Sequence, residues 1–258
     1  MKIISWNVNG LRAVYNRGFL DWLRKDKADI FCFQEIKAQS VLLPADLVNL
    51  ECYHSFFNSG SKKGQAGVAI YTRERPHTVQ NKIGLKRFDV EGRFLQLNYS
   101  EFILINVYLP HGGRQKENLN YKLEVYERLF KYLNRLKAQN SKLKVILIGD
   151  FNIAHTELDL ARPKENQNNI MFTPEERKQI DRLVDAGFID TFRKFNPKTK
   201  KYTWWPYFAH CRERNLGWRI DYIFISQNLI SQIKKAFIDK KTFGSDHCPI
   251  GIKIDLKI

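Results

Sequence analysis

Two apolar runs in this chain each lead into an acidic residue, and this repeated pattern constrains the fold more than any other feature. Residues 30–33 (IFCF) are followed one residue later by Glu35, and residues 145–148 (VILI) are followed one residue later by Asp150. A short continuous apolar run bounded by polar or turn residues is typical of a buried strand. Because the pattern occurs once in each half, it indicates an internal duplication in an α/β chain, with ligands expected at the strand ends.

The rest of the chain alternates expected helices and strands without a linker. Apolar residues recur every three or four positions from Asn118 to about Gln139, which predicts a long helix. The segment 173–176 predicts a helix start, with Thr173 as N-cap, proline at the first helical position and Glu176 completing a capping box. We therefore expect one domain over residues 1–258, of the α/β class, plausibly two packed sheets with helices outside. Further elements are expected as a helix around 19–23, strands at 3–6, 67–72, 94–99, 102–109 and 218–226, and a final strand after 245–249.

Composition favours a polyanionic partner inside the cell. The formal net charge is +16, and a protein that neutralises phosphates gains affinity from released counterions. The alternative is a highly charged, solvated surface. The four cysteines form no CxxC pair, which favours a reducing, cytoplasmic setting. The sequence shows no signal peptide and nothing near the ~18 consecutive apolar residues that span a bilayer, so we expect no membrane association.

Polar residues at the expected strand ends are candidates for chemistry. Glu35 taken alone is typical of a surface acid at a strand end. Asp150 and Asn152 are spaced by two, so their side chains share one side if the backbone is extended. The alternative is a turn, because glycine, aspartate and asparagine all favour turns.

Asp221 and the pair Asp246-His247 are less easily explained as surface residues. Asp221 lies among large apolar residues in 218–226, where a buried carboxylate must be paired or metal-bound. The alternative partner is an arginine such as Arg219. The pair Asp246-His247, with further acids at other strand ends, indicates a histidine held in one protonation state by a carboxylate.

Together these residues predict metal-assisted hydrolysis of a phosphate ester. Carboxylate and amide oxygens suit Mg²⁺, which takes few protein carboxylates and completes its shell with water and phosphate. The sequence contains no HExxH motif, no cysteine–histidine cluster and no Walker motif. Zinc hydrolases and P-loop enzymes therefore lose support.

Several segments of the chain resemble the motifs of a known protein family. The motifs SWNVNGLRA, FQEIK, GDFN, WRIDYIF and GSDHCPI resemble the endonuclease/exonuclease/phosphatase superfamily, and the segments GFLDWL, QEIK, DLARPKEN, FTPEER, YTWW and GWRIDY resemble its exonuclease III type of abasic (AP) endonuclease. The resemblance runs from Met1 to about Leu256. It implies a deoxyribonuclease I-like, four-layer α/β sandwich of two packed mixed β-sheets flanked by helices.

The resemblance also implies a metal site. Glu35 matches the principal metal-binding glutamate and Asp246 a second acid that contributes to the site, with Mg²⁺ as the cofactor and Mn²⁺ able to substitute. Asn9 lies where some members carry an aspartate. A neutral amide removes one negative charge there, so we expect weaker metal affinity and a less well formed second metal position.

Catalytic roles follow from the same match. Asp150 is expected to activate the attacking water or to protonate the leaving oxygen. The phosphate is expected to be contacted by His247, with Asp221 as its carboxylate partner, and by Tyr108; Asn7 and Asn152 orient the aspartate and the nucleophile. Preorganised donors of this kind stabilise the transition state of phosphoryl transfer.

The resemblance further implies how the substrate is bound. An abasic nucleotide flips out of the duplex at low cost, and Trp204, Trp218 and Ile220 match positions that line its pocket. The alternative is ordinary core packing. Arg114 matches a loop that inserts into the duplex in some relatives. Backbone contacts are plausible for Lys62-Lys63, the segment 212–214 and the lysine-rich run 198–201.

The function expected is hydrolysis of the phosphodiester 5′ to abasic sites in double-stranded DNA, by a monomer. The reaction leaves a 3′-hydroxyl and a 5′-deoxyribose phosphate, and 3′-to-5′ exonuclease and 3′-end cleaning activities are expected beside it. The rivals are a superfamily enzyme acting on ordinary DNA, on RNA or on a phosphorylated lipid or inositol, and a basic DNA-binding protein without activity. Incision assays with magnesium and EDTA separate them.

Overall fold

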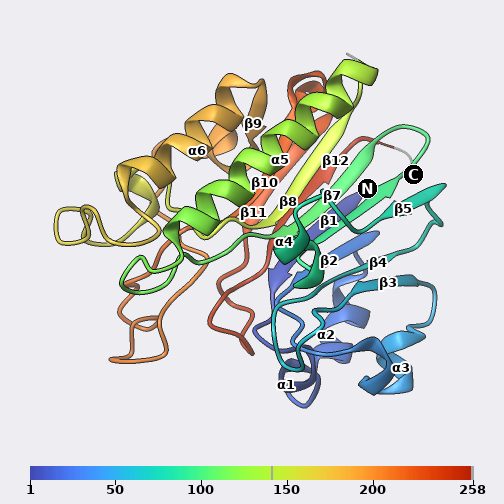
Figure 1. Ribbon diagram of the computed structural model, residues 1–258. Helices are drawn as coiled ribbons and strands as arrows, with labels where there is room; N and C mark the ends of the chain where they lie inside the picture. The colour runs from blue at the N-terminus through green and yellow to red at the C-terminus, as the bar shows by residue number, and fades with distance from the viewer. Residues whose placement is uncertain (141, 257–258) are drawn as a thin grey trace.

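Two six-stranded β-sheets form the centre of the computed structural model, which describes residues 1–140 and 142–256. The first sheet has the order β11-β12-β1-β2-β4-β3 and the second the order β5-β6-β7-β8-β10-β9 (Figure 1). The strands of the first sheet are β1 (Lys2–Asn7), β2 (Ile30–Gln34), β3 (His54–Asn58), β4 (Val68–Thr72), β11 (Ile233–Ile238) and β12 (Ile250–Ile254). Those of the second are β5 (Thr78–Gln80), β6 (Phe94–Asn98), β7 (Ile103–Tyr108), β8 (Val145–Asp150), β9 (Phe188–Asp190) and β10 (Asp221–Ser226).

Both sheets have the same pairing pattern. Each has a parallel pair at its centre, β1 with β2 and β7 with β8, and antiparallel neighbours on both sides. In the parallel pairs, Asn7 lies opposite Gln34 and Tyr108 lies opposite Asp150, at the carboxyl ends of the strands. The repeated topology agrees with the duplication that the two apolar runs indicate.

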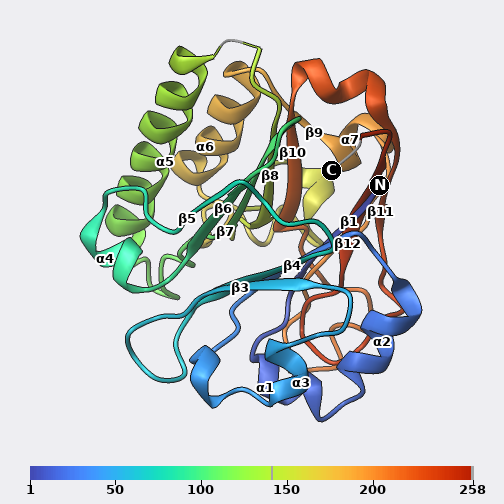
Figure 2. The ribbon, with the colours of Figure 1, turned by 90° about the vertical axis from the view of Figure 1, so that its right-hand side faces the viewer.

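The sheets and helices form four layers. The two sheets face each other across an apolar core that includes Ile3, Ile70, Leu104 and Ile223. Figure 2 shows α1 to α3 on the outer side of the first sheet and α5 with α6 on the outer side of the second. The predicted four-layer α/β sandwich is confirmed. The helices are α1 (Leu11–Tyr15), α2 (Phe19–Asp26), α3 (Ala45–Val48), α4 (Lys86–Val90), α5 (Leu119–Gln139), α6 (Pro174–Asp185) and α7 (Thr191–Phe195), with 3₁₀ turns at Ser40–Leu42, Glu157–Asp159 and Gln227–Gln232.

Local sequence signals locate the two long outer helices. α5 begins after Asn118 and ends at Gln139, as its apolar spacing predicts. α6 begins with the predicted capping box, in which the Thr173 side chain accepts from the Glu176 amide and the Glu176 side chain accepts from the Thr173 amide. The strand expected at 218–226 is shorter and begins at Asp221, because residue 218 instead forms isolated bridges. Among the described residues, no helix has the length and apolarity required to cross a membrane.

Candidate active site

Side chains from both sheets meet at the carboxyl ends of the two parallel pairs. Asn7, at the end of β1, donates through Nδ2 to Glu35 Oε2 at 3.0 Å and to Asp150 Oδ2 at 2.8 Å. Glu35 directly follows β2 in the first sheet, whereas Asp150 ends β8 in the second. One buried amide therefore joins the two acids that the repeated sequence pattern singled out.

The backbone at these strand ends bends sharply. Asn9, Glu35 and Asn152 have φ angles of 47°, 55° and 52°, in the left-handed region that non-glycine residues seldom adopt. Gly149 has a φ of 142°, and a Cβ there would lie 1.9 Å from the Val107 carbonyl oxygen. These bends occur where the strands end and the side chains of the site begin.

Asp150 and Asn152 form a turn that also brings their side chains together. The Asn152 amide donates to Asp150 Oδ1 at 2.8 Å, and Asn152 Nδ2 lies 3.2 Å from Asp150 Oδ2. Nδ2 of Asn152 also donates to the Leu109 carbonyl at 2.9 Å. The turn and the shared-site interpretations of this pair are therefore compatible, because an aspartate can accept from the backbone two residues later.

His247 is held by Asp221. Its Nδ1 lies 2.9 Å from Asp221 Oδ2, and its Nε2 lies 4.0 Å from Asp150 Oδ2. Arg219, the alternative partner of Asp221, turns away and forms buried ion pairs with Asp159 and Asp190, both at 2.7 Å. The imidazole therefore lies between two carboxylates at the base of the site.

The two titrating groups at this base have pKa values that are both raised, with opposite consequences for their charge. Burial raises the pKa of Asp150 to about 7, and the nearby Asp221 carboxylate adds to the rise. Burial opposes protonation of His247, but Asp221, Asp150 and Asp246 outweigh it and raise its pKa to about 10. At neutral pH the site thus holds an imidazolium beside a carboxyl group poised to exchange a proton.

The three predicted metal-site residues lie beside this centre. Asp246 accepts from Asn9 Nδ2 at 2.8 Å and from Trp204 Nε1 at 3.0 Å. Lys37, which sequence reasoning did not single out although it ends the QEIK motif, lies 2.9 Å from Glu35 Oε1 and 2.5 Å from Asn9 Oδ1. Because these two oxygens already bind an ammonium group, this part of the site favours positive charge. Carboxylate and amide oxygens are also the hard donors that fit Mg²⁺.

A second set of groups also has metal-site spacing. Ligand atoms of Asp150, Asp221 and His247 lie within 4.8 Å of one another. His247 Nδ1 is already engaged by Asp221 at 2.9 Å, and Mg²⁺ prefers carboxylate oxygens to imidazole nitrogen. Glu35 and Asp246 are therefore the better candidates.

Tyr108 is held at the rim of the site by an arginine that the sequence did not reveal. The Arg93 guanidinium lies 4.4 Å from the centre of the Tyr108 ring and donates to the Tyr108 carbonyl at 3.2 Å. Arg93 in turn donates to Glu91. Burial and the Glu35 carboxylate raise the pKa of the Tyr108 hydroxyl well above its usual value, so the hydroxyl remains a proton donor.

A cavity of about 780 Å³ opens beside Asp246. Trp204 and Trp218 line it, and Arg114 is exposed along its wall. Ile220 does not line it: only 1% of its surface is exposed, and it packs in the apolar cluster to which both tryptophans contribute. The cavity is also lined by His111, Asn166, Asn169, Ile170, Met171, Pro206, Tyr207 and Phe208.

Two exposed aromatic side chains line this cavity and were not predicted from the sequence as site residues. Tyr207 and Phe208 are 71% and 69% exposed, although large apolar side chains are ordinarily buried. They follow the YTWW motif after a single residue, Pro206, and that proximity is the one signal in the sequence. Their exposure offers a flat apolar surface beside the cavity.

The chain as a whole is similar to known nucleases. Residues 4–247 match the endonuclease/exonuclease/phosphatase family. The chain is 42% identical over 258 residues to an exodeoxyribonuclease of Bacillus subtilis (strain 168), with 99% of this chain and 100% of that protein covered. It is 40% identical over 253 residues to the DNA repair nuclease APEX1 of Danio rerio, with 97% of this chain and 81% of that protein covered.

Solved structures agree. An AP endonuclease from Archaeoglobus fulgidus has a TM-score of 0.89 at 30% identity, covering 99% of this chain and 100% of that one. A 3′ phosphatase, NExo from Neisseria bound to a product DNA hairpin, has a TM-score of 0.91 at 28% identity, with the same coverage. The chain therefore belongs to the endonuclease/exonuclease/phosphatase family, where its relatives are exodeoxyribonucleases and abasic-site endonucleases.

Proposed function

We propose that this protein is a magnesium-dependent endonuclease that hydrolyses the phosphodiester 5′ to abasic sites in double-stranded DNA. One observation carries the proposal: His247, held by Asp221 through Nδ1 at 2.9 Å, lies 4.0 Å from the Asp150 carboxylate at the base of the site. We also propose that the protein acts inside the cell and that it is a monomer. Its net charge of +16 supports a polyanionic substrate.

The side chains of the site divide the work of hydrolysis. Asp150 takes the proton of the attacking water, whose oxygen forms the new bond to phosphorus. The bond to the 3′-oxygen of the preceding nucleotide breaks, and this oxygen becomes a hydroxyl by taking up, through water, the proton that Asp150 accepted. The His247 imidazolium and the Tyr108 hydroxyl donate to the phosphate oxygens, where negative charge grows in the transition state.

Glu35 and Asp246 are the side chains proposed to hold Mg²⁺. When bound, this ion offsets the charge that develops on the phosphate. Asn7 bridges Glu35 to Asp150 and so fixes the spacing between the metal corner and the proton acceptor. Lys37, whose Nζ lies 2.9 Å from Glu35 Oε1, would share this carboxylate with the ion.

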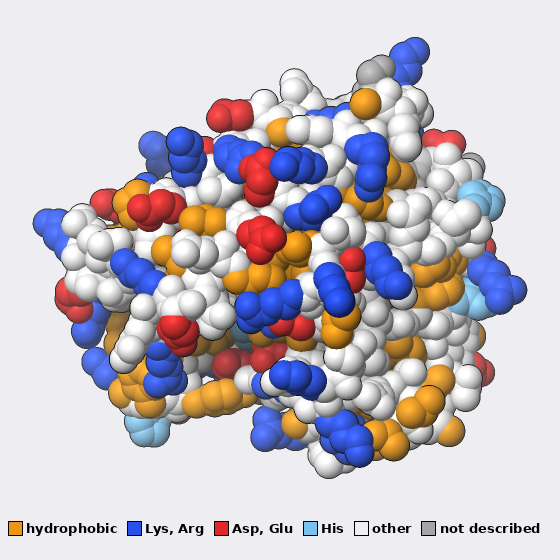
Figure 3. Space-filling view, in the orientation of Figure 1, with side chains coloured by type: hydrophobic (Ala, Val, Ile, Leu, Met, Phe, Trp, Pro, Cys, Tyr) orange, Lys and Arg blue, Asp and Glu red, His pale blue; other side chains and the backbone are white. Residues whose placement is uncertain are grey.

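The tryptophan-lined cavity supports the choice of an abasic substrate. A nucleotide without a base flips out of the stack at low cost, and Trp204 with Trp218 offers apolar walls for its sugar. Tyr207 and Phe208 are proposed to contact the duplex beside it. Figure 3 shows lysines and arginines spread over one face of the molecule, with acids among them. Cationic side chains of this kind would bind the phosphates of the duplex.

A second activity is proposed at the same site, on DNA 3′ ends. The Neisseria relative is described as a 3′-5′ exonuclease and as a 3′ phosphatase, and both reactions hydrolyse a phosphate ester at a 3′ oxygen. The residues proposed for abasic-site cleavage would serve them unchanged.

Incision assays test the proposal. The wild-type protein should nick an abasic duplex in magnesium, leave the internal linkages of an intact duplex, RNA and inositol polyphosphates essentially uncut, and stop in EDTA. Asp150→Asn and His247→Asn should lower the incision rate at least about 10²- to 10³-fold while duplex binding stays within about threefold. Lys235→Ala, on an exposed strand position, serves as the control. Incision by either active-site variant at the rate of the control would contradict the assignment.

A further inference from the structure

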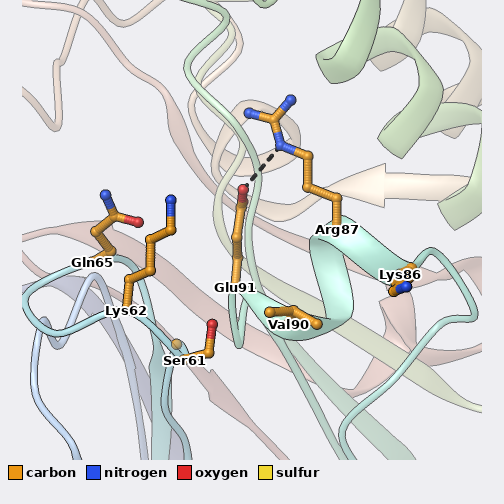
Figure 4. Close-up of a pocket in the computed structure, with 8 residues that line it drawn as sticks. Ser61, Lys62, Gln65, Lys86, Arg87, Val90 and Glu91 are labelled. Carbon is orange, nitrogen blue, oxygen red and sulfur yellow. Dashed lines mark hydrogen bonds and ion pairs between the residues drawn. The ribbon is translucent and has the colours of Figure 1, made fainter.

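A second hollow lies outside the active site, between the loop 60–65 and α4. Its volume is about 690 Å³. Figure 4 shows Lys62 and Gln65 on the loop side facing Glu91 across the gap, with Arg87 rising from α4 and Lys86 farther along the helix. Gly60, Ser61 and Val90 complete the lining. We call this hollow the α4 groove.

The α4 groove is cationic. Lys62, Lys86 and Arg87 line it against one carboxylate, Glu91. That carboxylate is already neutralised: it pairs with Arg87 at 3.1 Å and with Arg93, and although burial alone would raise its pKa, these guanidinium groups lower it. Among the described residues, no carboxylate lies within ion-pair distance of Lys62 or Lys86.

The walls of the groove are fixed before any ligand arrives. The Ser61 amide donates to the Val90 carbonyl at 3.0 Å, which ties the loop to the end of α4. A Cβ on Gly60 would lie 2.7 Å from the Gln65 carbonyl oxygen, and one on Gly92 would lie 2.6 Å from the backbone of Ser59. Arg87 is also held, because its guanidinium lies 3.7 Å from the centre of the Tyr121 ring. The backbone walls and Arg87 are therefore preformed, and a ligand would have to order only the exposed Lys62 and Lys86 side chains.

The groove is connected to the active site at two points. On one side, Glu91 accepts from Arg93, which stacks on Tyr108 at the rim of the site. On the other, the loop continues to Ala66, whose carbonyl accepts from the Lys37 amide at 2.9 Å. The α4 groove therefore adjoins the rim of the active site.

We propose that the α4 groove binds a backbone phosphate of the DNA duplex outside the linkage that is cleaved, with Lys62 and Lys86 as its free cations and Arg87 as its fixed one. This inference rests on the proposed function for its substrate class. It extends the DNA-binding surface to a helix that carries no active-site residue. Phosphate contacts of this kind position the duplex without reading its sequence.

The test compares two charge-matched double variants. Lys62→Ala/Lys86→Ala removes the free cations of the groove, whereas Lys235→Ala/Lys253→Ala removes two exposed lysines from β11 and β12. Duplex binding is measured in EDTA over a series of salt concentrations, with an abasic and an intact duplex, and incision is measured in magnesium. Thermal unfolding of all three proteins shows that the surface changes leave the fold intact.

The groove variant should bind both duplexes about 3- to 20-fold more weakly and lower the salt slope by about 1 for each phosphate that is no longer neutralised. Its KM should rise while kcat stays within about twofold. Equal salt slopes for the two double variants, or a decrease confined to kcat, would overturn the inference. Binding to the intact duplex does not depend on incision. A protein that fails to cleave abasic sites would therefore refute the proposed function, whereas the binding measurement alone would decide the inference about the α4 groove.

Discussion

Replacing Lys122 with methionine should destabilise the protein more than any surface change. Lys122 Nζ is fully buried in α5 and donates to the Glu176 carboxylate at 2.5 Å, to the Asn152 carbonyl at 2.6 Å and to the His111 carbonyl at 3.2 Å. All three of its protons are thus used. Glu176 is equally buried, and within the described part of the chain its carboxylate otherwise accepts only from the Thr173 amide.

The expected cost follows from what the substitution leaves behind. Lys122→Met keeps a similar volume but strands a buried carboxylate without its cation, which typically costs about 3–5 kcal/mol. Domains of this kind are stable by only about 5–15 kcal/mol, and each kcal/mol shifts the unfolding temperature by roughly 2–4 °C at this size. We therefore expect the midpoint to fall by roughly 6–20 °C. The freed Asn152 carbonyl should also loosen the turn that carries Asp150, so kcat should fall more than the affinity for DNA.

Thermal and urea unfolding test this prediction on four proteins, the wild type and three variants. Lys131→Met is the matched control, because Lys131 is on the same helix and its ion pair with Glu127 is exposed; it should cost under about 1 kcal/mol. Lys122→Met/Glu176→Gln removes both charges while keeping an oxygen for the α6 cap, and should recover at least half of the loss. If Lys122→Met lowers the free energy of unfolding by no more than Lys131→Met does, the buried pair of Lys122 and Glu176 does not stabilise the packing of α5 against α6.

Four further predictions concern the active site and its rim. Incision should increase with pH as Asp150 loses its proton near 7 and decrease toward 10 as His247 loses its own; a rate that does not vary between pH 6 and 8 would exclude Asp150 as the proton acceptor. The free energy of unfolding of the metal-free protein should decrease as the pH rises, because both groups have folded-state pKa values above their unfolded values. The stabilisation from Asp150 is complete below its unfolded pKa of about 3.9 and is lost as the pH rises through about 7, and that from His247 is complete below about 6.5 and is lost through about 10. Urea titrations at several pH values measure this dependence. Asn9→Asp should lower the magnesium concentration for half-maximal incision, because it adds a negative charge beside Asp246, and an unchanged or higher requirement would separate Asn9 from the metal site. Phe208→Ala should raise KM for the abasic duplex several-fold, within the ~1–3 kcal/mol that aromatic contacts to bases contribute, with kcat little changed; an unaltered KM would leave the exposed ring without a role in DNA binding.

Local patterns in the sequence located the central strands and the two long outer helices. The apolar runs before Glu35 and Asp150 became central strands β2 and β8, because continuous apolar runs are stable only where both faces are covered. The capping box at 173–176 began α6 where predicted, since its hydrogen bonds involve neighbours in sequence. The strand around Asp221 was predicted too long, because the pairing that ends a strand depends on which segment lies beside it.

The sequence by itself therefore determined the α/β class, the family and the positions of the acids at strand ends, because periodicity, caps and motifs are written in consecutive residues. The resemblance also implied that Asp221, 26 positions from His247, is its partner, and the two side chains do lie 2.9 Å apart. Only the tertiary structure decided the other contacts: it paired Arg219 with Asp159 and Asp190, buried Ile220 and exposed Phe208. It also raised the pKa values of Asp150 and His247, since both burial and the distance between charges arise only when the two sheets pack.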